Sequence, residues 1–235
     1  MRPLLVLWDV DFTLIDASGV GQHLYQLALA ELYGLDLPAG MQSMAGRTDA
    51  SIALEVLTLA GVPEPLTQLT TFQAIQAARA PQLDAMLRER GRVLPGAAEA
   101  IAALAGPGHS AKIIQSLLTG NIPALAQVKL GALGLTDHLD FGIGAYGDVS
   151  EVRADLVGVA RRNATARYGG DYAGRATVLI GDTPNDVEAG ALTGARVVGV
   201  ASGSFTVRQL ADAGADAVLT DLRDTAAVVA AVLAS

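Results

Sequence analysis

Two aspartates, Asp9 and Asp11, follow directly after an apolar run at residues 4–8 (LLVLW). A carboxylate at the end of a buried strand loses hydration, so hydrogen bonds or a cation must replace the lost water. The pair therefore predicts either a solvent-exposed turn or a bound cation at this end of the strand.

Polar residues also follow two later apolar runs. Thr119, Gly120 and Asn121 come after IIQSLL, and Asp182 comes after ATVLIG, with Asp186 four residues further on. In open parallel sheets, ligands bind beyond the carboxyl ends of the strands. We therefore expect these residues to converge on one edge of a sheet, together with the first acidic pair.

Carboxylates gathered at one edge repel each other unless a cation joins them. Oxygen ligands without cysteine or clustered histidine favour a hard ion, and Mg²⁺ is the usual choice beside a phosphate. Thr119 and the backbone amides of Gly120 and Asn121 lie at a predicted helix start, where N–H groups bind phosphate oxygens. Pro123 suits the first turn of that helix. The pattern predicts a Mg²⁺ site beside a phosphate-binding site.

Three of these segments resemble motifs of the haloacid dehalogenase superfamily of hydrolases. DVDFTL resembles its DxDxT signature, LLTGN its second motif, and LIGDTPNDVEAG its fourth motif. The order and the wide spacing of the three segments are also similar to those of the family. Residues 16–90, which follow the first motif and carry helical patterns, resemble the cap of the subfamily that contains phosphoglycolate phosphatase and β-phosphoglucomutase.

The resemblance implies a role for each site residue. Asp9 would be the nucleophile that forms an aspartyl-phosphate. Asp11 would protonate the leaving alcohol and then deprotonate the attacking water. The metal ligands would be Asp9, Asp11 through its main-chain carbonyl, Asp182, and Asp186 as a ligand or as support for one. The phosphate and substrate contacts would come from Thr13, Thr119, Gly120, Asn121 and Arg47.

Asp11 also separates two chemistries of the superfamily. The family's dehalogenases lack an acid at this position, because a halide leaves without a proton. The alkoxide that leaves a phosphate ester needs a proton. The resemblance therefore implies a phosphatase rather than a dehalogenase.

The family also has a basic residue, in its third motif, that offsets the acidic cluster. Two residues could fill this role. Lys129 lies about 9 Å along its helix from Pro123, and its side chain leans back toward the helix start. Arg153 opens the helix after the apolar run at residues 139–145, nearer to the family's usual location. Lys129, Arg153 or both would complete the catalytic set.

Two positions carry a second interpretation. Phe12 stands where the subfamily commonly has glycine, so either its ring packs under the cap, or it narrows the site or abolishes the activity. Arg47 lies in GRTD at residues 46–49. There it either faces the site as an anion contact or simply precedes a helix that Thr48 caps.

Apolar runs alternate with helical patterns over most of the chain, which is typical of helices on both faces of a parallel sheet. The predicted strands are 4–8, 112–118, 139–145, 177–180, 196–200 and 217–219, and the predicted helices between and after them are 123–133, 154–168, 185–193, 206–213 and 225–234. Residues 16–90 carry only helical patterns, at 22–32, 50–59, 66–79 and 81–90. A single crossover needs about a dozen residues. We therefore predict an α/β, Rossmann-like doubly wound core (1–15 and 91–235) with an inserted all-helical cap domain (16–90).

Composition and charge exclude several classes of protein. The chain has 24 acidic and 16 basic residues, a net charge of −8, so nucleic acid is not an expected partner. It has no cysteine, which excludes disulfides, thiolate metal sites and a cysteine nucleophile. No apolar stretch approaches the ~18 residues of a membrane span, and no signal peptide is visible. We expect a cytoplasmic protein with no membrane partner.

Together these observations predict a Mg²⁺-dependent phosphatase that acts on a small phosphorylated metabolite through an aspartyl-phosphate. The alternatives are a phosphomutase, in which a sugar phosphate replaces water as the acceptor, and a non-catalytic binding protein. Substrate choice should depend on the cap, because the core residues determine only the chemistry.

Overall fold

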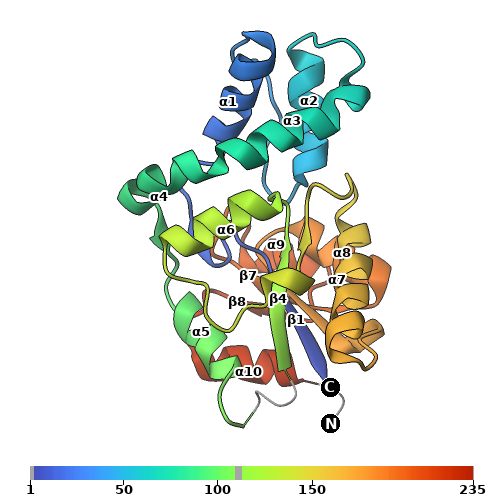
Figure 1. The fold of residues 1–235 in the computed structure, drawn as a ribbon. Helices are drawn as coiled ribbons and strands as arrows, with labels where there is room; N and C mark the ends of the chain where they lie inside the picture. Colours follow the sequence, from blue (N-terminus) through green and yellow to red (C-terminus); the bar gives the residue numbers. More distant parts are fainter. Residues whose placement is uncertain (1–2, 109–112, 235) are drawn as a thin grey trace.

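The computed structural model describes residues 3–108 and 113–234. The described part of the chain folds around a sheet of six parallel strands in the order β5-β4-β1-β6-β7-β8 (Figure 1). The strands are β1 (Leu4–Trp8), β4 (Ile113–Thr119), β5 (Ala145–Tyr146), β6 (Thr177–Gly181), β7 (Arg196–Val200) and β8 (Ala217–Leu219). This is a doubly wound strand order, so the predicted Rossmann-like α/β fold is confirmed.

The register of the sheet brings three strand ends together. Trp8, the last residue of β1, pairs with Leu117 of β4 on one side and with Ile180 of β6 on the other. The residues that follow these strands therefore emerge at the same edge, where the strand order reverses. Ligands bind at such points in doubly wound sheets.

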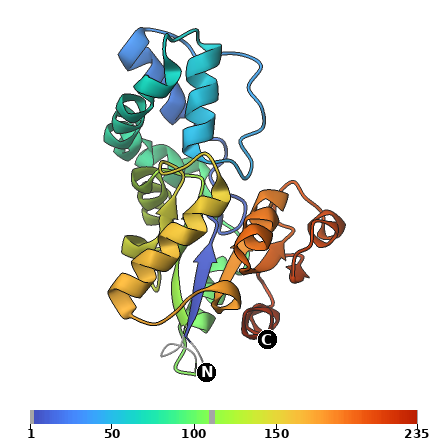
Figure 2. The same ribbon diagram turned by 90° about the vertical axis from the view of Figure 1, so that its right-hand side faces the viewer.

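Helices cover both faces of the sheet (Figure 2). Along β1, Val6 and Trp8 pack into one apolar cluster, whereas Leu5 and Leu7 pack into the other. The first cluster includes residues of α5 (Ala97–Leu104), α6 (Pro123–Ala132) and α10 (Thr225–Leu233), and the second includes residues of α7 (Arg153–Tyr168), α8 (Pro184–Thr193) and α9 (Val207–Asp212). Because both faces are buried, β1 is apolar throughout instead of alternating with polar residues.

Three helices lie beyond the carboxyl ends of the strands: α1 (Gln22–Tyr33), α2 (Asp49–Leu59) and α3 (Pro65–Arg79) (Figure 1). They share a separate apolar cluster that includes Tyr25, Leu29, Val56 and Phe72. Two short strands that pair antiparallel, β2 (Ile15–Asp16) and β3 (Arg92–Val93), lie where the chain leaves the core and returns to it. We propose that this helical unit is the cap.

The segment between α3 and β3 packs differently from the rest of the proposed cap. It forms a 3-10 turn at Ala80–Leu83 followed by α4 (Asp84–Arg90), where the sequence pattern predicts one helix. Leu83 and Leu87 are buried in the same apolar cluster as residues of α6. Residues 80–90 therefore pack on the core, although they fall within the segment 16–90.

The predicted strand at residues 139–145 is wrong over most of its length. Phe141–Ile143 form a 3-10 turn, in which the Asp140 side chain accepts a backbone N–H, and only the two residues of β5 pair with β4. Leu139 and Ile143 are nevertheless buried. An apolar run indicates that residues are buried, but it does not distinguish a strand from a tightly packed turn.

Two other differences concern element boundaries. Helix α5 and the β2–β3 pair are absent from the sequence-based prediction. Lys112, the first residue of the predicted strand 112–118, lies outside the described residues. None of the helices in the described part of the chain combines the length and apolarity that crossing a membrane requires.

Candidate active site

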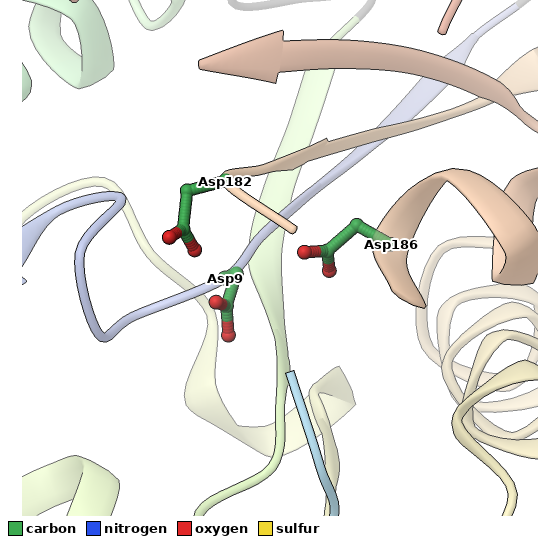
Figure 3. A group of neighbouring side chains, drawn as sticks. All are labelled: Asp9, Asp182 and Asp186. Atoms are coloured by element: carbon green, nitrogen blue, oxygen red, sulfur yellow. The ribbon is translucent and has the colours of Figure 1, made fainter. Parts of the chain in front are cut away.

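Three aspartates meet at the carboxyl edge of the sheet (Figure 3). Asp9 follows β1, Asp182 follows β6, and Asp186 lies in the first turn of α8. One carboxylate oxygen of each lies within 4.8 Å of those of the other two, and all three residues are buried. This spacing suits a single cation that all three side chains bind.

The start of α8 fixes the position of Asp186. Thr183 caps this helix, and the Asp186 carboxylate accepts hydrogen bonds from the Thr183 backbone N–H (3.1 Å) and hydroxyl (2.7 Å). A Cβ on Gly181 would lie 2.2 Å from the carboxylate carbon of Asp186, so a side chain at the end of β6 would displace it. A single capped helix start thus positions one of the three carboxylates.

Burial raises the pKa values of two of these carboxyls. The pKa of Asp9 rises to about 6, because burial penalises the charged form more than Arg153 stabilises it. The pKa of Asp182 rises to about 8 through burial, and the charges of Asp9 and Asp186 add to the effect. The Oδ1 atom of Asp182 is buried and has no hydrogen-bond partner among the described residues. A divalent cation would supply that partner and offset the repulsion, so the residues fit Mg²⁺.

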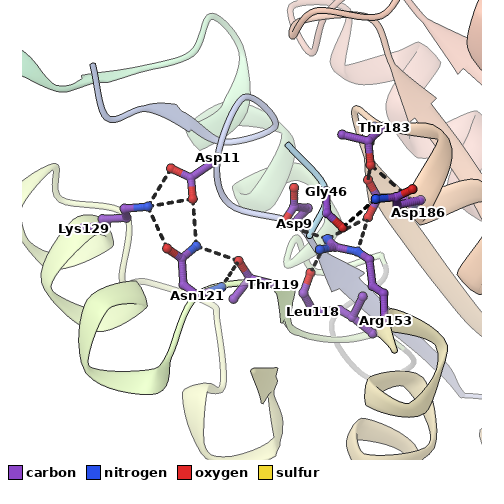
Figure 4. A network of polar contacts seen from close by, with 11 residues as sticks. Asp9, Asp11, Gly46, Leu118, Thr119, Asn121, Lys129, Arg153, Thr183 and Asp186 are labelled. Atoms are coloured by element: carbon purple, nitrogen blue, oxygen red, sulfur yellow. Dashed lines mark hydrogen bonds and ion pairs between the residues drawn. The ribbon is translucent and has the colours of Figure 1, made fainter. Parts of the chain in front are cut away.

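Arg153, the first residue of α7, is a buried cation beside this cluster (Figure 4). Its guanidinium lies 2.9 Å from Asp9 Oδ1 and 2.7 Å from Asp186 Oδ1, and it donates to the Leu118 carbonyl at 3.2 Å. Burial alone would lower the pKa of Arg153, but Asp186 and Asp9 together outweigh burial and raise it well above its ordinary value. Arg153 therefore stays charged and balances part of the acidic cluster.

A second network surrounds Asp11 (Figure 4). Lys129 of α6 donates to both carboxylate oxygens of Asp11 and to the side-chain oxygen of Asn121, each at 2.7 Å. Asn121 in turn donates to Asp11 at 2.8 Å and to the Thr119 hydroxyl at 2.7 Å. The structure thus brings both candidate basic residues, Lys129 and Arg153, to the site, each beside a different carboxylate.

Both networks line one cavity of about 960 Å³, a volume that includes its solvent-open part. The sequence-predicted residues on its wall are Asp9, Asp11, Arg47, Thr119, Gly120, Asn121, Lys129, Arg153 and Asp182. The larger apolar wall residues, Tyr25, Met44, Ile52 and Leu125, were not predicted from the sequence. They lie outside the motifs, and in the sequence they match ordinary helix-core or loop positions, so no local signal identifies them.

Three further predicted residues can be compared with their expected roles. Thr13 is fully buried, its hydroxyl has no hydrogen-bond partner among the described residues, and it is absent from the cavity wall, so the expected phosphate contact through its side chain is not supported. The Asp11 carboxylate lies in the second network, which agrees with the expectation that Asp11 would contact the metal only through its main-chain carbonyl. Arg47 lines the cavity, but its guanidinium binds Glu55 and Ser51 of α2.

Phe12 lines the cavity with a left-handed backbone, at φ 60°. Glycine adopts this conformation freely, whereas a residue with a Cβ loses roughly 1 kcal/mol there. The left-handed backbone explains why glycine suits this position in the subfamily. In this chain the same position adds an aromatic ring to the cavity wall.

Residues 4–194 match the model of the haloacid dehalogenase-like hydrolases. The chain belongs to this family. The predicted membership and the prediction that the chain is an enzyme of the hydrolase class are therefore confirmed. This hydrolase is 28% identical over 217 residues to the probable phosphatase IndB of Dickeya dadantii (strain 3937), an alignment that covers 89% of this chain and 86% of the relative.

Solved structures share the fold of this haloacid dehalogenase-like hydrolase. A hydrolase from Pseudomonas syringae has a TM-score of 0.65 at 21% identity. The alignment covers 96% of this chain and 97% of the Pseudomonas chain. CbbY from Rhodobacter sphaeroides, solved in complex with phosphate, has a TM-score of 0.56 at 21% identity. The alignment covers 95% of this chain and 96% of the CbbY chain. A putative β-phosphoglucomutase from Bacteroides vulgatus has a TM-score of 0.61 at 16% identity. The alignment covers 98% of this chain and 89% of the Bacteroides chain.

Proposed function

We propose that this chain is a Mg²⁺-dependent phosphatase that hydrolyses a small phosphorylated metabolite through an aspartyl-phosphate on Asp9. One observation carries the proposal: Asp9 and Asp11 line the same cavity but bind different partners. Asp9 lies in the acidic cluster beside Arg153, whereas Asp11 lies beside Lys129. Two carboxylates in different environments can serve different steps of one reaction.

Asp9, Asp182 and Asp186, with the main-chain carbonyl of Asp11, would hold the metal. When bound, Mg²⁺ would reduce the repulsion between the nucleophile and the phosphate and withdraw charge from the phosphoryl oxygens. Arg153 adds a fixed positive charge that contacts the nucleophile directly. Together these groups make the attack of one anion on another feasible.

In the proposed reaction, a carboxylate oxygen of Asp9 attacks phosphorus while the bond from phosphorus to the leaving oxygen breaks. Asp11 gives a proton to that oxygen, so the product leaves as an alcohol. Asp11 then takes a proton from water, whose oxygen attacks phosphorus and releases inorganic phosphate from Asp9. Thr119, Gly120 and Asn121 line the cavity at the start of α6 and would orient the transferring group.

The family membership and the similarity to the probable phosphatase IndB support phosphatase chemistry. The structure of CbbY in complex with phosphate supports a phosphate-binding site in a protein of this fold. A phosphomutase would use the same residues, with a sugar phosphate in place of water in the second step. This chemistry is the alternative outcome of the experiment below.

The test compares the wild type with Asp9→Asn, which keeps the shape of the side chain and removes the nucleophile. We expect hydrolysis of p-nitrophenyl phosphate and of a panel of metabolite phosphate esters in MgCl₂, loss of this activity in EDTA, and a loss of at least roughly 10³-fold in the variant. Incubation with a phosphate ester should form an aspartyl-phosphate, which hydroxylamine cleaves, only in the wild type. Its formation in Asp9→Asn would refute the assignment of the nucleophile, and faster turnover of a sugar monophosphate with its bisphosphate added would favour a mutase.

A further inference from the structure

We propose that the substrate's leaving group is uncharged and partly apolar, and that the site discriminates against a second anionic group on the substrate. This inference rests on the proposed phosphatase function and narrows its substrates to phosphate monoesters of neutral alcohols. The cavity wall outside the acidic cluster carries the argument, since that wall surrounds whatever is attached to the phosphate.

The large apolar side chains on this wall are Phe12, Tyr25, Met44, Ile52 and Leu125. Ala17 and Ala45 add smaller apolar surface, and Ser18 and Gln22 add uncharged polar groups. Tyr25 has a polar group, but its hydroxyl donates to the buried Asp49 at 2.6 Å, so the ring is what it offers to a ligand. Apolar surface that a ligand covers contributes binding free energy in proportion to its area. This part of the cavity therefore favours carbon-rich groups over charged ones.

Each cation on the described cavity wall already has a carboxylate partner. Lys129 pairs with Asp11 at 2.7 Å, and Arg153 pairs with two carboxylates of the acidic cluster. Arg47, the remaining cation of the wall, pairs with Glu55 of α2. A second anionic group on a substrate would therefore have to displace one of these partners or stay without a counter-charge.

The start of α2, which faces the core, offers no free anion-binding amides either. The Asp49 N–H donates to the Gly120 carbonyl at 2.7 Å. The Ala50 N–H donates to the Gly147 carbonyl, also at 2.7 Å. The next amide of the helix donates to the side chain of Thr48. Helix starts bind anions through such N–H groups, and here the first three are used.

The test uses two esters of equal shape that differ in charge, 2-phosphoglycolate and its amide, with 4-carboxyphenyl and 4-carbamoylphenyl phosphate as a second pair. We expect the wild type to hydrolyse the neutral member of each pair with a kcat/KM at least tenfold higher. Equal or faster turnover of the carboxylates would overturn the inference about charge. Failure to hydrolyse the neutral esters by an enzyme that hydrolyses p-nitrophenyl phosphate would also overturn this inference. Inactivity on every ester, p-nitrophenyl phosphate included, would overturn the proposed function instead, so the two failures are distinguishable.

A variant outside the cavity wall sharpens the test. Glu55→Gln leaves Arg47 without its carboxylate partner, so the preference for the neutral ester should fall at least threefold. The matched control is Glu31→Gln, which frees Arg79 of α3 from an ion pair away from the cavity and should leave the preference unchanged. An unchanged preference in Glu55→Gln would show that Arg47 does not depend on Glu55, and would contradict the inference.

Discussion

Asp9 and Asp11 are two residues apart in the chain, yet their carboxylates belong to two separate ion-pair networks. Arg153 lies 2.9 Å from Asp9, and Lys129 lies 2.7 Å from Asp11. The two cations come from different helices, α7 and α6. Removing one cation should therefore affect one carboxylate and leave the other in place, so the two steps of the proposed reaction can be separated by mutation.

The first prediction concerns Lys129 as a positioning residue for Asp11. Lys129→Met should lower kcat by roughly 10- to 100-fold for an alkyl phosphate, because Asp11 loses the group that orients it as the acid. The loss should be clearly smaller for p-nitrophenyl phosphate, because nitrophenolate leaves without a proton. Steady-state kinetics with both esters measure the difference.

Lys129→Arg is the matched variant, because it keeps a positive charge at the same position. It should recover part of the activity on the alkyl ester. An equal loss on both esters in Lys129→Met would contradict a role in leaving-group protonation and would indicate a general structural defect instead.

The second prediction concerns the cation site. Mg²⁺ at 100 times its Kd should stabilise the wild type by about 2.7 kcal/mol and raise its Tm by several degrees, because only the folded protein has the site. Asp182→Asn should lose most of this shift, since it removes a ligand whose Oδ1 has no other partner in the described structure. Asp137→Asn, at an exposed position, is the control that should keep the full shift. A full shift in Asp182→Asn would place the metal elsewhere.

The grouping of the acidic residues could be predicted from the sequence, because it depends on topology more than on detailed packing. Strands of a parallel sheet end at one edge, so Asp9 and Asp182 must lie near each other once β1 and β6 are neighbours. Asp186 follows four residues later on a capped helix start. The relation between Asp182 and Asp186 is thus encoded within a single motif, and that between Asp9 and Asp182 follows from the order of the strands.

The partners of the acids could not be predicted in the same way. Which of Lys129 and Arg153 meets which carboxylate depends on how α6 and α7 pack on opposite faces of the sheet. The cavity wall residues Tyr25 and Ile52 belong to a different apolar cluster, and their position at the site depends on how the helical unit is placed over the core. The sequence encodes such placement only through the whole set of tertiary contacts.

The third prediction concerns the contact between α2 and the core. A Cβ on Gly147 would lie 2.0 Å from the Gly120 carbonyl oxygen and 2.6 Å from the backbone nitrogen of Asp49. Gly147→Ala should therefore separate α2 from the core, with a loss of about 1–3 kcal/mol in stability and a raised KM. Urea unfolding and kinetics on p-nitrophenyl phosphate measure both effects.

Gly131→Ala is the control for this substitution. A Cβ at Gly131 of α6 would meet no atom within 4 Å, and alanine favours the helix by roughly 0.5–1 kcal/mol. This variant should be as stable as the wild type or more stable, with an unchanged KM. A KM for Gly147→Ala equal to that of the wild type would contradict a role of this contact in closing the site.

The fourth prediction concerns Asp49, a buried carboxyl in the proposed cap. Burial raises the pKa of Asp49 to about 6, although it accepts hydrogen bonds from Tyr25, Gln73 and Gln76. An acid whose pKa is higher in the folded state than in the unfolded state binds more protons when folded. Its contribution to stability is therefore complete below about pH 4, the unfolded pKa, and is lost as the pH rises through about 6.

Asp49→Asn removes this titration and keeps the shape of the side chain. Between pH 5 and pH 8 the wild type should lose roughly 1–2 kcal/mol of stability relative to the variant, because only the wild type must bury a charge at the higher pH. Urea unfolding of both proteins at the two pH values measures the difference. Parallel stability curves would show that Asp49 ionises as easily in the folded protein as in the unfolded chain.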